Sequence, residues 1–265
     1  MGSGAPRKLS LVSQLVTLSA AGTDFTAYVA TPKGAPEEYR GAIIVIHEVW
    51  GLVDEIRNVA DRYAAEGYLA IAPDLMGELG VSADEADDLQ VRLVSTDHDE
   101  LAAAQVRLRE LMAPITAPAF ATRAIHRLIA TIDHLHRQTA VAGRIAVTGF
   151  SFGGSYAFSL AVADPRVRAS LPFYAYANLP GELLAEIACP ILYFVGEDDP
   201  ALFAALPALT EQMKAAHVDF TAIAYRNAGH AFFNESNTHA YRKDAAKDAW
   251  KKSLAFLAEN LHTAR

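Results

Sequence analysis

The order of hydrophobic and polar residues divides the chain into an alternating start and a longer part built from apolar runs. Apolar and polar residues alternate over 14–19 and 25–30, on either side of 21–24, which predicts an opening β-hairpin. The later runs are short and almost entirely apolar, as in strands that are buried on both faces of a sheet. They cover 42–47, 68–72, 145–148, 169–174, 191–195 and 220–224.

The segments between these runs are predicted to be amphipathic helices. Apolar residues recur on one face of 56–65 and on one face of 121–135. Strands that alternate with helices predict an α/β fold with a mostly parallel central sheet flanked by helices on both faces. The segment 76–118 is acidic and then helical, and we interpret it as a wall or cap for a pocket.

Composition indicates one globular domain. The chain has 265 residues, 52% of them hydrophobic, which is enough for a sizeable core. No repeat, low-complexity tract or linker rich in Pro, Gly or Ser divides it, so we predict a single α/β domain over 1–265. Its only cysteine is Cys189, which is compatible with a reducing compartment and is expected to pack as a small, inert hydrophobic residue.

Charge and hydropathy limit the kinds of partner and the cellular location that we expect for this protein. The net charge of −8 argues against nucleic acid and anionic membrane surfaces, because both select basic patches. No apolar stretch is long enough to span a bilayer, and residues 1–6 lack the hydrophobic segment of a signal peptide. We therefore predict a cytoplasmic protein.

The most informative chemical motif is G-x-S-x-G at 149–153, with Ser151 at its centre. It follows the apolar run 145–148 and precedes a helix-like segment at 155–162, and a strand that turns over G-x-S-x-G into a helix is the nucleophile elbow of α/β-hydrolases. Glycines flank the serine because Cβ atoms there would collide with the adjoining strand and helix. The helix start also offers unpaired N–H groups that favour negative charge near Ser151. A chance match in a Gly-rich turn is the alternative, and the flanking strand and helix argue against it.

A nucleophilic serine needs a base, and the base needs a third group to hold it. Hydrolases with this elbow place the partners in the order Ser, Asp or Glu, His, on loops after later strands. The loop that follows 191–195 carries Asp198 and Asp199, and the loop that follows the next run carries His230. We favour Asp199, which lies three residues past Gly196, over Asp198. The alternatives are an acidic turn that caps the next helix and an exposed loop histidine.

Further motifs support a family resemblance. They are HEVWG at 47–51, APDL at 72–75, GEDD at 196–199 and GHAF at 229–232. With these motifs and the elbow, the chain resembles the dienelactone hydrolase family over most of its length. The resemblance implies that Glu48 lies beside the nucleophile and that the backbone N–H groups of Val49 and Phe152 form the oxyanion hole. A surface carboxylate is the alternative interpretation of Glu48.

Two positions depart from the family pattern. Well-known members carry cysteine where this chain has Ser151, so the thiolate-activating role of the glutamate does not carry over unchanged, and serine depends more completely on His230. The bacterial dienelactone enzymes hold the substrate carboxylate with an arginine a few residues past the catalytic histidine. That position is Asn234 here, which argues against dienelactone itself as the substrate.

Aromatic residues near these motifs are candidates for the pocket wall. Trp50 and Phe152 flank the proposed oxyanion donors, and Tyr174 and Tyr176 close a strand at the same edge of the sheet. We assign Trp50, Tyr174, Tyr176 and Phe232 to substrate binding, although partly buried tyrosines are also ordinary in sheets. His47 is interpreted as a packing residue at a strand end.

These observations predict a serine hydrolase that needs no cofactor and no metal and acts on a small carboxylic ester or lactone. Ser151 attacks, His230 transfers the proton, Asp199 fixes the imidazole, and Glu48 assists. Acyl transfer or peptide cleavage by the same triad is an alternative, because a fold does not fix the substrate. A ligand-binding pseudoenzyme that kept the pocket is another.

Overall fold

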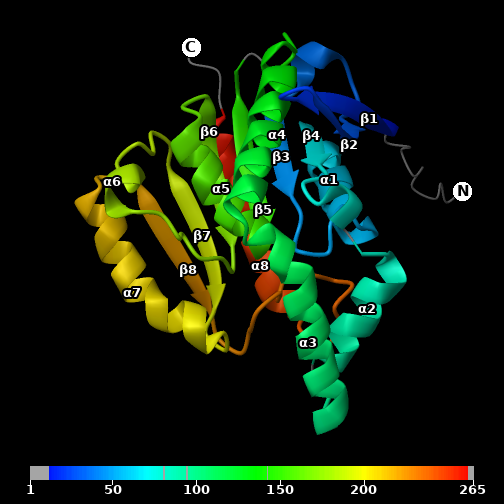
Figure 1. The fold of residues 1–265 in the computed structure, drawn as a ribbon. Helices are drawn as coiled ribbons and strands as arrows, with labels where there is room; N and C mark the ends of the chain where they lie inside the picture. Colours follow the sequence, from blue (N-terminus) through cyan, green and yellow to red (C-terminus); the bar gives the residue numbers. More distant parts are fainter. Residues whose placement is uncertain (1–11, 80, 94, 142, 262–265) are drawn as a thin grey trace, which may run out of the picture.

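A sheet of eight strands runs through the protein, in the order β1-β2-β4-β3-β5-β6-β7-β8 (Figure 1). The computed structural model describes residues 12–79, 81–93, 95–141 and 143–261, so the segment 1–6 considered above lies outside the described residues. The strands are β1 (Val12–Ala20), β2 (Thr23–Thr31), β3 (Gly41–Ile46), β4 (Tyr68–Pro73), β5 (Ile145–Phe150), β6 (Val167–Phe173), β7 (Ile191–Gly196) and β8 (Phe220–Tyr225).

The strand pairing accounts for the two hydrophobic patterns in the sequence. Strands β1 and β2 form the predicted antiparallel hairpin, β2 pairs antiparallel with β4, and every later pairing is parallel. Strands β3, β4, β5 and β7 are buried at every position, because helices cover both faces of a parallel sheet. Strand β1 lies at the edge and is largely exposed, so its polar residues alternate with apolar ones.

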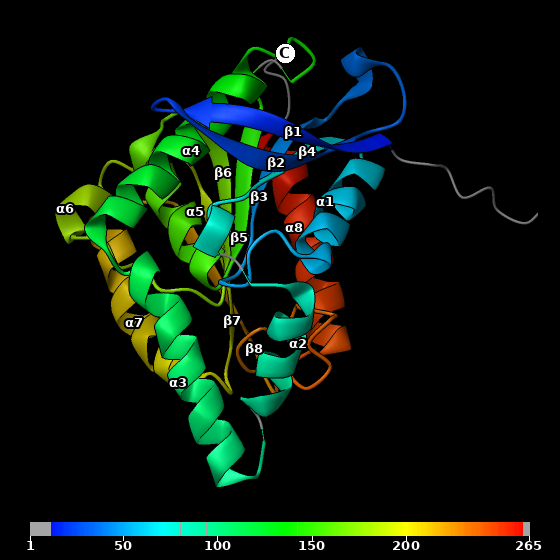
Figure 2. The ribbon, with the colours of Figure 1, turned by 45° about the vertical axis from the view of Figure 1, so that its right-hand side comes forward.

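Helices cover both faces of the sheet. They are α1 (Asp54–Ala65), α2 (Ala83–Arg92), α3 (His98–Ile115), α4 (Pro118–His136), α5 (Phe152–Ala163), α6 (Gly181–Leu184), α7 (Pro200–Ala215) and α8 (Lys243–Asn260). Helices α1 and α8 lie on one face, where the rings of Tyr63 and Trp250 approach to 4.5 Å, and α4, α5 and α7 lie on the other (Figure 2). This arrangement confirms the predicted fold class. None of the described helices is long and apolar enough to cross a membrane.

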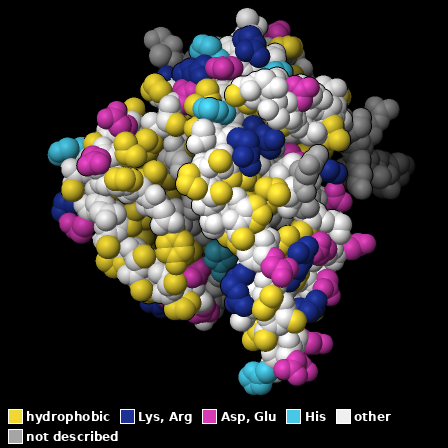
Figure 3. Space-filling view, in the orientation of Figure 1, with side chains coloured by type: hydrophobic (Ala, Val, Ile, Leu, Met, Phe, Trp, Pro, Cys, Tyr) yellow, Lys and Arg dark blue, Asp and Glu magenta, His cyan; other side chains and the backbone are white. Residues whose placement is uncertain are grey.

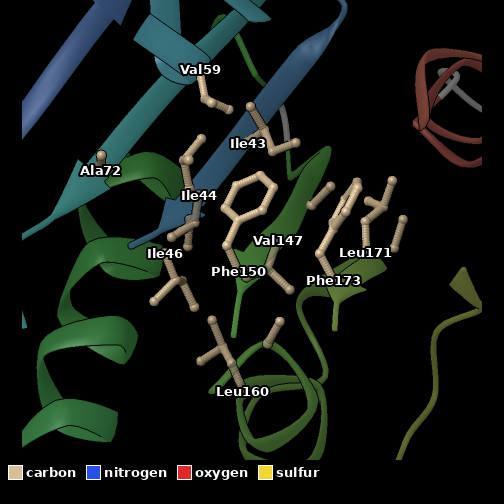
Figure 4. Packing of buried hydrophobic residues seen from close by; sticks show 14 of the residues in the cluster. Ile43, Ile44, Ile46, Val59, Ala72, Val147, Phe150, Leu160, Leu171 and Phe173 are labelled. Atoms are coloured by element: carbon tan, nitrogen blue, oxygen red, sulfur yellow. The ribbon is translucent and has the colours of Figure 1, made fainter. Parts of the chain in front are cut away.

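The core fixes the carboxyl ends of the central strands. Val59 of α1 and Leu160 of α5 pack on opposite sides of strands β3 and β5 (Figure 4). Near those ends, the Phe150 and Phe173 rings lie 4.9 Å apart, which joins β5 to β6. Burial of such side chains contributes about 1.5–3 kcal/mol each, so loops that leave these strands start from a rigid base.

Helices α2 and α3 form a hairpin that projects beyond the carboxyl edge of the sheet (Figures 1 and 2). Asp97 caps α3 by accepting hydrogen bonds from the backbone N–H groups of Asp99, at 2.8 Å, and Glu100, at 3.1 Å. Residues Ala86, Leu89 and Ala104 of the hairpin form a small apolar cluster with Trp50. Through Trp50, this cluster connects the segment 76–118 to the loop after β3.

Candidate active site

Ser151 occupies a strained turn between β5 and α5. Its φ is 53° and its ψ is −113°, a conformation that non-glycine residues rarely adopt. The flanking glycines are sterically required: a Cβ on Gly149 would lie 2.1 Å from the Gly153 carbonyl oxygen, and a Cβ on Gly153 would lie 2.3 Å from that of Ile46. Such strain is typical of functional sites. The G-x-S-x-G sequence is therefore what lets the serine sit at the end of the sheet.

This packing predicts that Gly153→Ala lowers the free energy of unfolding by at least about 2 kcal/mol, because the new methyl group meets backbone carbonyls of Ile46 and His47 that cannot rotate away. Gly181→Ala is the matched control. It lies at the start of α6 with no atom within 4 Å of the added Cβ, so little change is expected. Urea unfolding followed by circular dichroism measures both, and equal stabilities would refute the packing argument.

Ser151, His230 and Asp199 form a continuous hydrogen-bonded chain. The Ser151 Oγ lies 2.8 Å from His230 Nε2, and His230 Nδ1 lies 2.7 Å from Asp199 Oδ2. A carboxylate only accepts hydrogen bonds, so Nδ1 must carry a proton and Nε2 presents its lone pair to the serine hydroxyl. The arrangement has the geometry that a serine nucleophile and its base require.

The same carboxylate of Asp199 also caps α7. Its Oδ1 accepts a hydrogen bond from the Leu202 backbone N–H at 3.4 Å, while Oδ2 faces His230. Asp199 therefore both caps α7 and holds His230. Asp198 is exposed, and its backbone N–H donates to the Ala228 carbonyl. Of the two candidate acids, the structure brings Asp199 to the histidine.

Backbone N–H groups of Val49 and Phe152 are available beside the serine. Both residues line the same cavity as Ser151. Phe152 begins α5, where the first N–H groups have no carbonyl partner within the helix. Among the described residues, neither N–H donates to a backbone carbonyl. These two groups can therefore donate to an oxyanion, as the family resemblance implies.

Glu48 is buried at the end of β3 and is held by two donors. The Tyr174 hydroxyl donates to its Oε1 at 3.2 Å, and the Asn234 amide donates to its Oε2 at 2.8 Å. Burial raises the pKa of Glu48, while the charge of His230 and the two hydrogen bonds act in the opposite direction. Glu48 is thus neither a surface carboxylate nor bonded to the serine hydroxyl here, since the hydroxyl faces His230.

Asn234 is a site residue whose contact with Glu48 was not predicted from the sequence. It is 5% exposed, its amide donates to Glu48, and its Oδ1 accepts hydrogen bonds from the backbone N–H groups of Ser236 and Asn237. The residue that replaces the family's arginine is therefore bonded to the buried carboxylate. Its position four residues past His230 was the one signal in the sequence.

The candidate site opens into a cavity of about 580 Å³. Of the predicted wall residues, Trp50, Phe152, Tyr174 and Tyr176 line it, together with Glu48, Ser151 and His230. The α2–α3 segment supplies a further wall that no motif indicated. Its lining residues are Gln90, Leu93, Leu108, Met112, Ile115 and Thr116. The segment 76–118 therefore walls the pocket.

Phe232 does not line this cavity, contrary to the expectation from sequence. It is fully buried beneath the site, with its ring centroid 5.5 Å from that of Tyr174 and 5.3 Å from that of Tyr225. The loop around His230 turns the histidine toward the cavity and the phenylalanine toward the sheet. Its packing supports the loop, and it makes no wall for a substrate.

Two residues set aside as structural are fully packed. His47 is buried, its Nδ1 donates to the Glu48 carbonyl at 2.6 Å, and its Nε2 accepts from the Leu75 N–H at 2.9 Å. Burial lowers the pKa of His47, which agrees with a neutral ring that joins two loops. Burial raises the pKa of the Cys189 thiol to about 12, so this thiol is a poor nucleophile.

The strand order, the elbow and the loop positions of the site define a member of the α/β-hydrolase class. The family model of the dienelactone hydrolase family matches residues 25–261, and the chain belongs to this family. A Saccharolobus solfataricus protein with the name "Putative carboxymethylenebutenolidase" is 30% identical over 251 residues, 89% of this chain and 94% of that protein. "Protein usf" of Aquifex pyrophilus is 29% identical over 94% of this chain and all of its own length.

Solved structures share the fold. A dienelactone hydrolase-like promiscuous phosphotriesterase from metagenomic libraries superimposes with a TM-score of 0.74 at 22% identity, covering 94% of this chain and 98% of its own. A dienelactone hydrolase from Anabaena variabilis gives a TM-score of 0.66 at 18% identity, with 95% and 99% covered.

Proposed function

We propose that this protein hydrolyses a small carboxylic ester or lactone through Ser151, His230 and Asp199. The observation that carries the proposal is the hydrogen-bonded chain from the serine hydroxyl through the imidazole to the buried carboxylate. The name carboxymethylenebutenolidase, borne by the Saccharolobus relative, supports an ester or lactone as the substrate class. We keep the cytoplasmic location as a prediction from the sequence.

The proposed reaction has two half-steps. Ser151 Oγ bonds to the carbonyl carbon while its proton passes to His230 Nε2, and the carbonyl electron pair moves to oxygen. The N–H groups of Val49 and Phe152 donate to that oxyanion. Cleavage of the C–O bond then expels the alkoxide, which takes the proton from His230. In the second step, water attacks the acyl-enzyme carbonyl while its proton passes to His230. Cleavage of the bond to Ser151 Oγ then releases the acid, and the serine takes the proton back from His230.

In this mechanism, Asp199 holds the imidazole in the tautomer that accepts the serine proton and stabilises the imidazolium that follows. Glu48 supplies a second negative charge near His230, because the two groups line the same cavity and interact electrostatically. An ionised Glu48 favours the protonated histidine of the transition state. Tyr174 and Asn234 position this carboxylate by their hydrogen bonds.

A panel of para-nitrophenyl esters and simple lactones tests the proposal. We expect stoichiometric release of acid and alcohol from at least one short ester. Product analysis with added alcohol or amine acceptors distinguishes hydrolysis from acyl transfer, and a short peptide amide tests for peptidase activity. Failure of the whole panel, with no serine labelled by a fluorophosphonate, would favour a ligand-binding protein.

Glu48→Gln is expected to lower kcat by roughly ten- to a thousandfold, because the variant keeps the shape of the side chain and loses its charge. The Tyr174 hydroxyl can accept a hydrogen bond from the new amide, so the local packing is retained. A carboxyl group with a raised pKa costs stability once it is ionised. The variant should therefore be at least as stable as wild type at neutral pH. As the pH falls through the pKa of Glu48 in the folded protein, the stability of wild type should rise relative to that of the variant. Unchanged kcat would reduce Glu48 to a structural residue.

A further inference from the structure

Glu55 is a second buried carboxylate close to the candidate active site. Acidic side chains are common at the surface, as over the α2–α3 hairpin (Figure 3), but Glu55, in the first turn of α1, is only 8% exposed. Its Oε1 accepts a hydrogen bond from the backbone N–H of Glu235 at 3.3 Å, and its Oε2 accepts one from the Ser236 hydroxyl at 3.2 Å. Glu55 therefore holds a segment that lies 180 residues further along the chain.

That segment connects Glu55 to Glu48. Residues 235 and 236 directly follow Asn234, whose amide nitrogen donates to Glu48 Oε2 at 2.8 Å. The backbone N–H of Ser236 in turn donates to Asn234 Oδ1 at 3.0 Å. Ser236 thus binds Glu55 with its hydroxyl and Asn234 with its backbone. A continuous set of hydrogen bonds leads from Glu55 to the carboxylate of Glu48.

The charge of Glu55 is unfavourable to Glu48. Both carboxylates, with Asn234, line a common cavity of about 10 Å³. Burial raises the pKa of both groups, and the charge of Glu55 raises the pKa of Glu48 further. An acid in the first turn also favours the helix dipole, but the exposed neighbour Asp54 already provides one there. What Glu55 contributes to Glu48 therefore comes from its hydrogen bonds.

We propose that Glu55 is a positioning residue that holds residues 235 and 236, so that the Asn234 amide keeps Glu48 in place. The proposal rests on the proposed ester hydrolysis. Glu55 is not among the described residues that line the cavity with the nucleophile, so substrate binding should not depend on it. Its effect should appear in kcat, because an ionised Glu48 favours the protonated histidine of the transition state.

Three substitutions, assayed with a short para-nitrophenyl ester, separate hydrogen bonding from charge. Glu55→Ala removes both bonds and should lower kcat by about tenfold, with KM changed by less than about twofold. Glu55→Gln can still accept from the Glu235 N–H and donate to the Ser236 hydroxyl, so its kcat should stay within about twofold of wild type. Glu55→Asp keeps the charge but is one methylene shorter, and it should resemble Glu55→Ala.

Two results of this comparison would overturn the proposal. Wild-type kcat in Glu55→Ala would show that the reaction does not depend on this side chain. An active Glu55→Asp beside a Glu55→Gln as poor as Glu55→Ala would assign the effect to charge instead of hydrogen bonds.

A double-mutant cycle with Glu48→Gln shows whether Glu55 acts through Glu48. In that background the contribution of the Glu48 carboxylate is already lost. Glu55→Ala should then lower kcat by less than about twofold, because residues that act on one another give non-additive effects. A merely structural role would leave the factor the same in both backgrounds. An undiminished tenfold loss in the Glu48→Gln enzyme would therefore refute the proposal.

Asp54→Ala is the matched control. Asp54 precedes Glu55 in the same helical turn, and its exposed carboxylate bonds to Arg57 of the same helix. This variant should keep the wild-type kcat, and a loss as large as that of Glu55→Ala would assign the effect to a disturbed α1 and overturn the proposal. If Glu55→Ala fails to fold, Glu55→Asp and Glu55→Gln in the two backgrounds still decide.

The same assays distinguish this proposal from the proposed function. If wild type cleaves no ester, the proposed function fails. If wild type cleaves the ester and all three Glu55 variants match it, only the role of Glu55 fails.

Discussion

Ser151→Ala is expected to reduce kcat for a short ester by at least about 10⁴-fold. The members of a triad act as a unit, and removal of the nucleophile leaves only binding and the oxyanion donors. The variant should stay folded, because Ser151 Oγ bonds only to the exposed His230 and alanine takes up less space in the same turn. Steady-state kinetics and a thermal unfolding curve measure the two effects.

Ser151→Cys provides the matched control for this prediction. A thiol at the same position, next to His230, remains a nucleophile. We expect partial activity from this variant and none from the alanine variant. An alanine variant that hydrolyses the ester near the wild-type rate would show that the elbow serine does not carry the reaction.

His230→Ala is expected to lower kcat by a similar factor and to remove the rise of activity with pH. An imidazole acts as a base only when it is unprotonated. The wild type should therefore gain activity as the pH rises. His126→Ala, an exposed histidine on α4, is the control and should keep the profile. If activity still rises with pH in His230→Ala, another group acts as the base, with Glu48 as the first candidate.

The sequence predicted the strands well because the parallel sheet buries them on both faces, which leaves short apolar runs as an unambiguous signal. Helix α5 begins at Phe152, earlier than the predicted segment from 155. Gly153 and Gly154 resemble helix breakers in the sequence. In the structure they lie inside the helix. Both positions must be glycine because a Cβ on Gly153 would meet the Ile46 carbonyl, and one on Gly154 would meet Ala175.

Only those residues of the candidate site that belong to a local sequence motif could be predicted. Ser151, Asp199 and His230 each follow a strand that the apolar pattern reveals. The surroundings of Glu48 were not predictable, since its donors Tyr174 and Asn234 lie 126 and 186 residues further along the chain. Phe232 was misplaced because no local rule tells which side of a tight loop faces the cavity.

Labelling with a fluorophosphonate tests most directly whether His230 and the elbow activate Ser151. In this reaction the serine oxygen bonds to phosphorus, fluoride leaves, and the proton passes to the histidine. Intact-mass and peptide mass spectrometry should find one adduct on wild type, at Ser151, with none on Ser151→Ala and much slower labelling of His230→Ala. Adducts at another residue, or equal labelling of wild type and His230→Ala, would contradict the proposed mechanism.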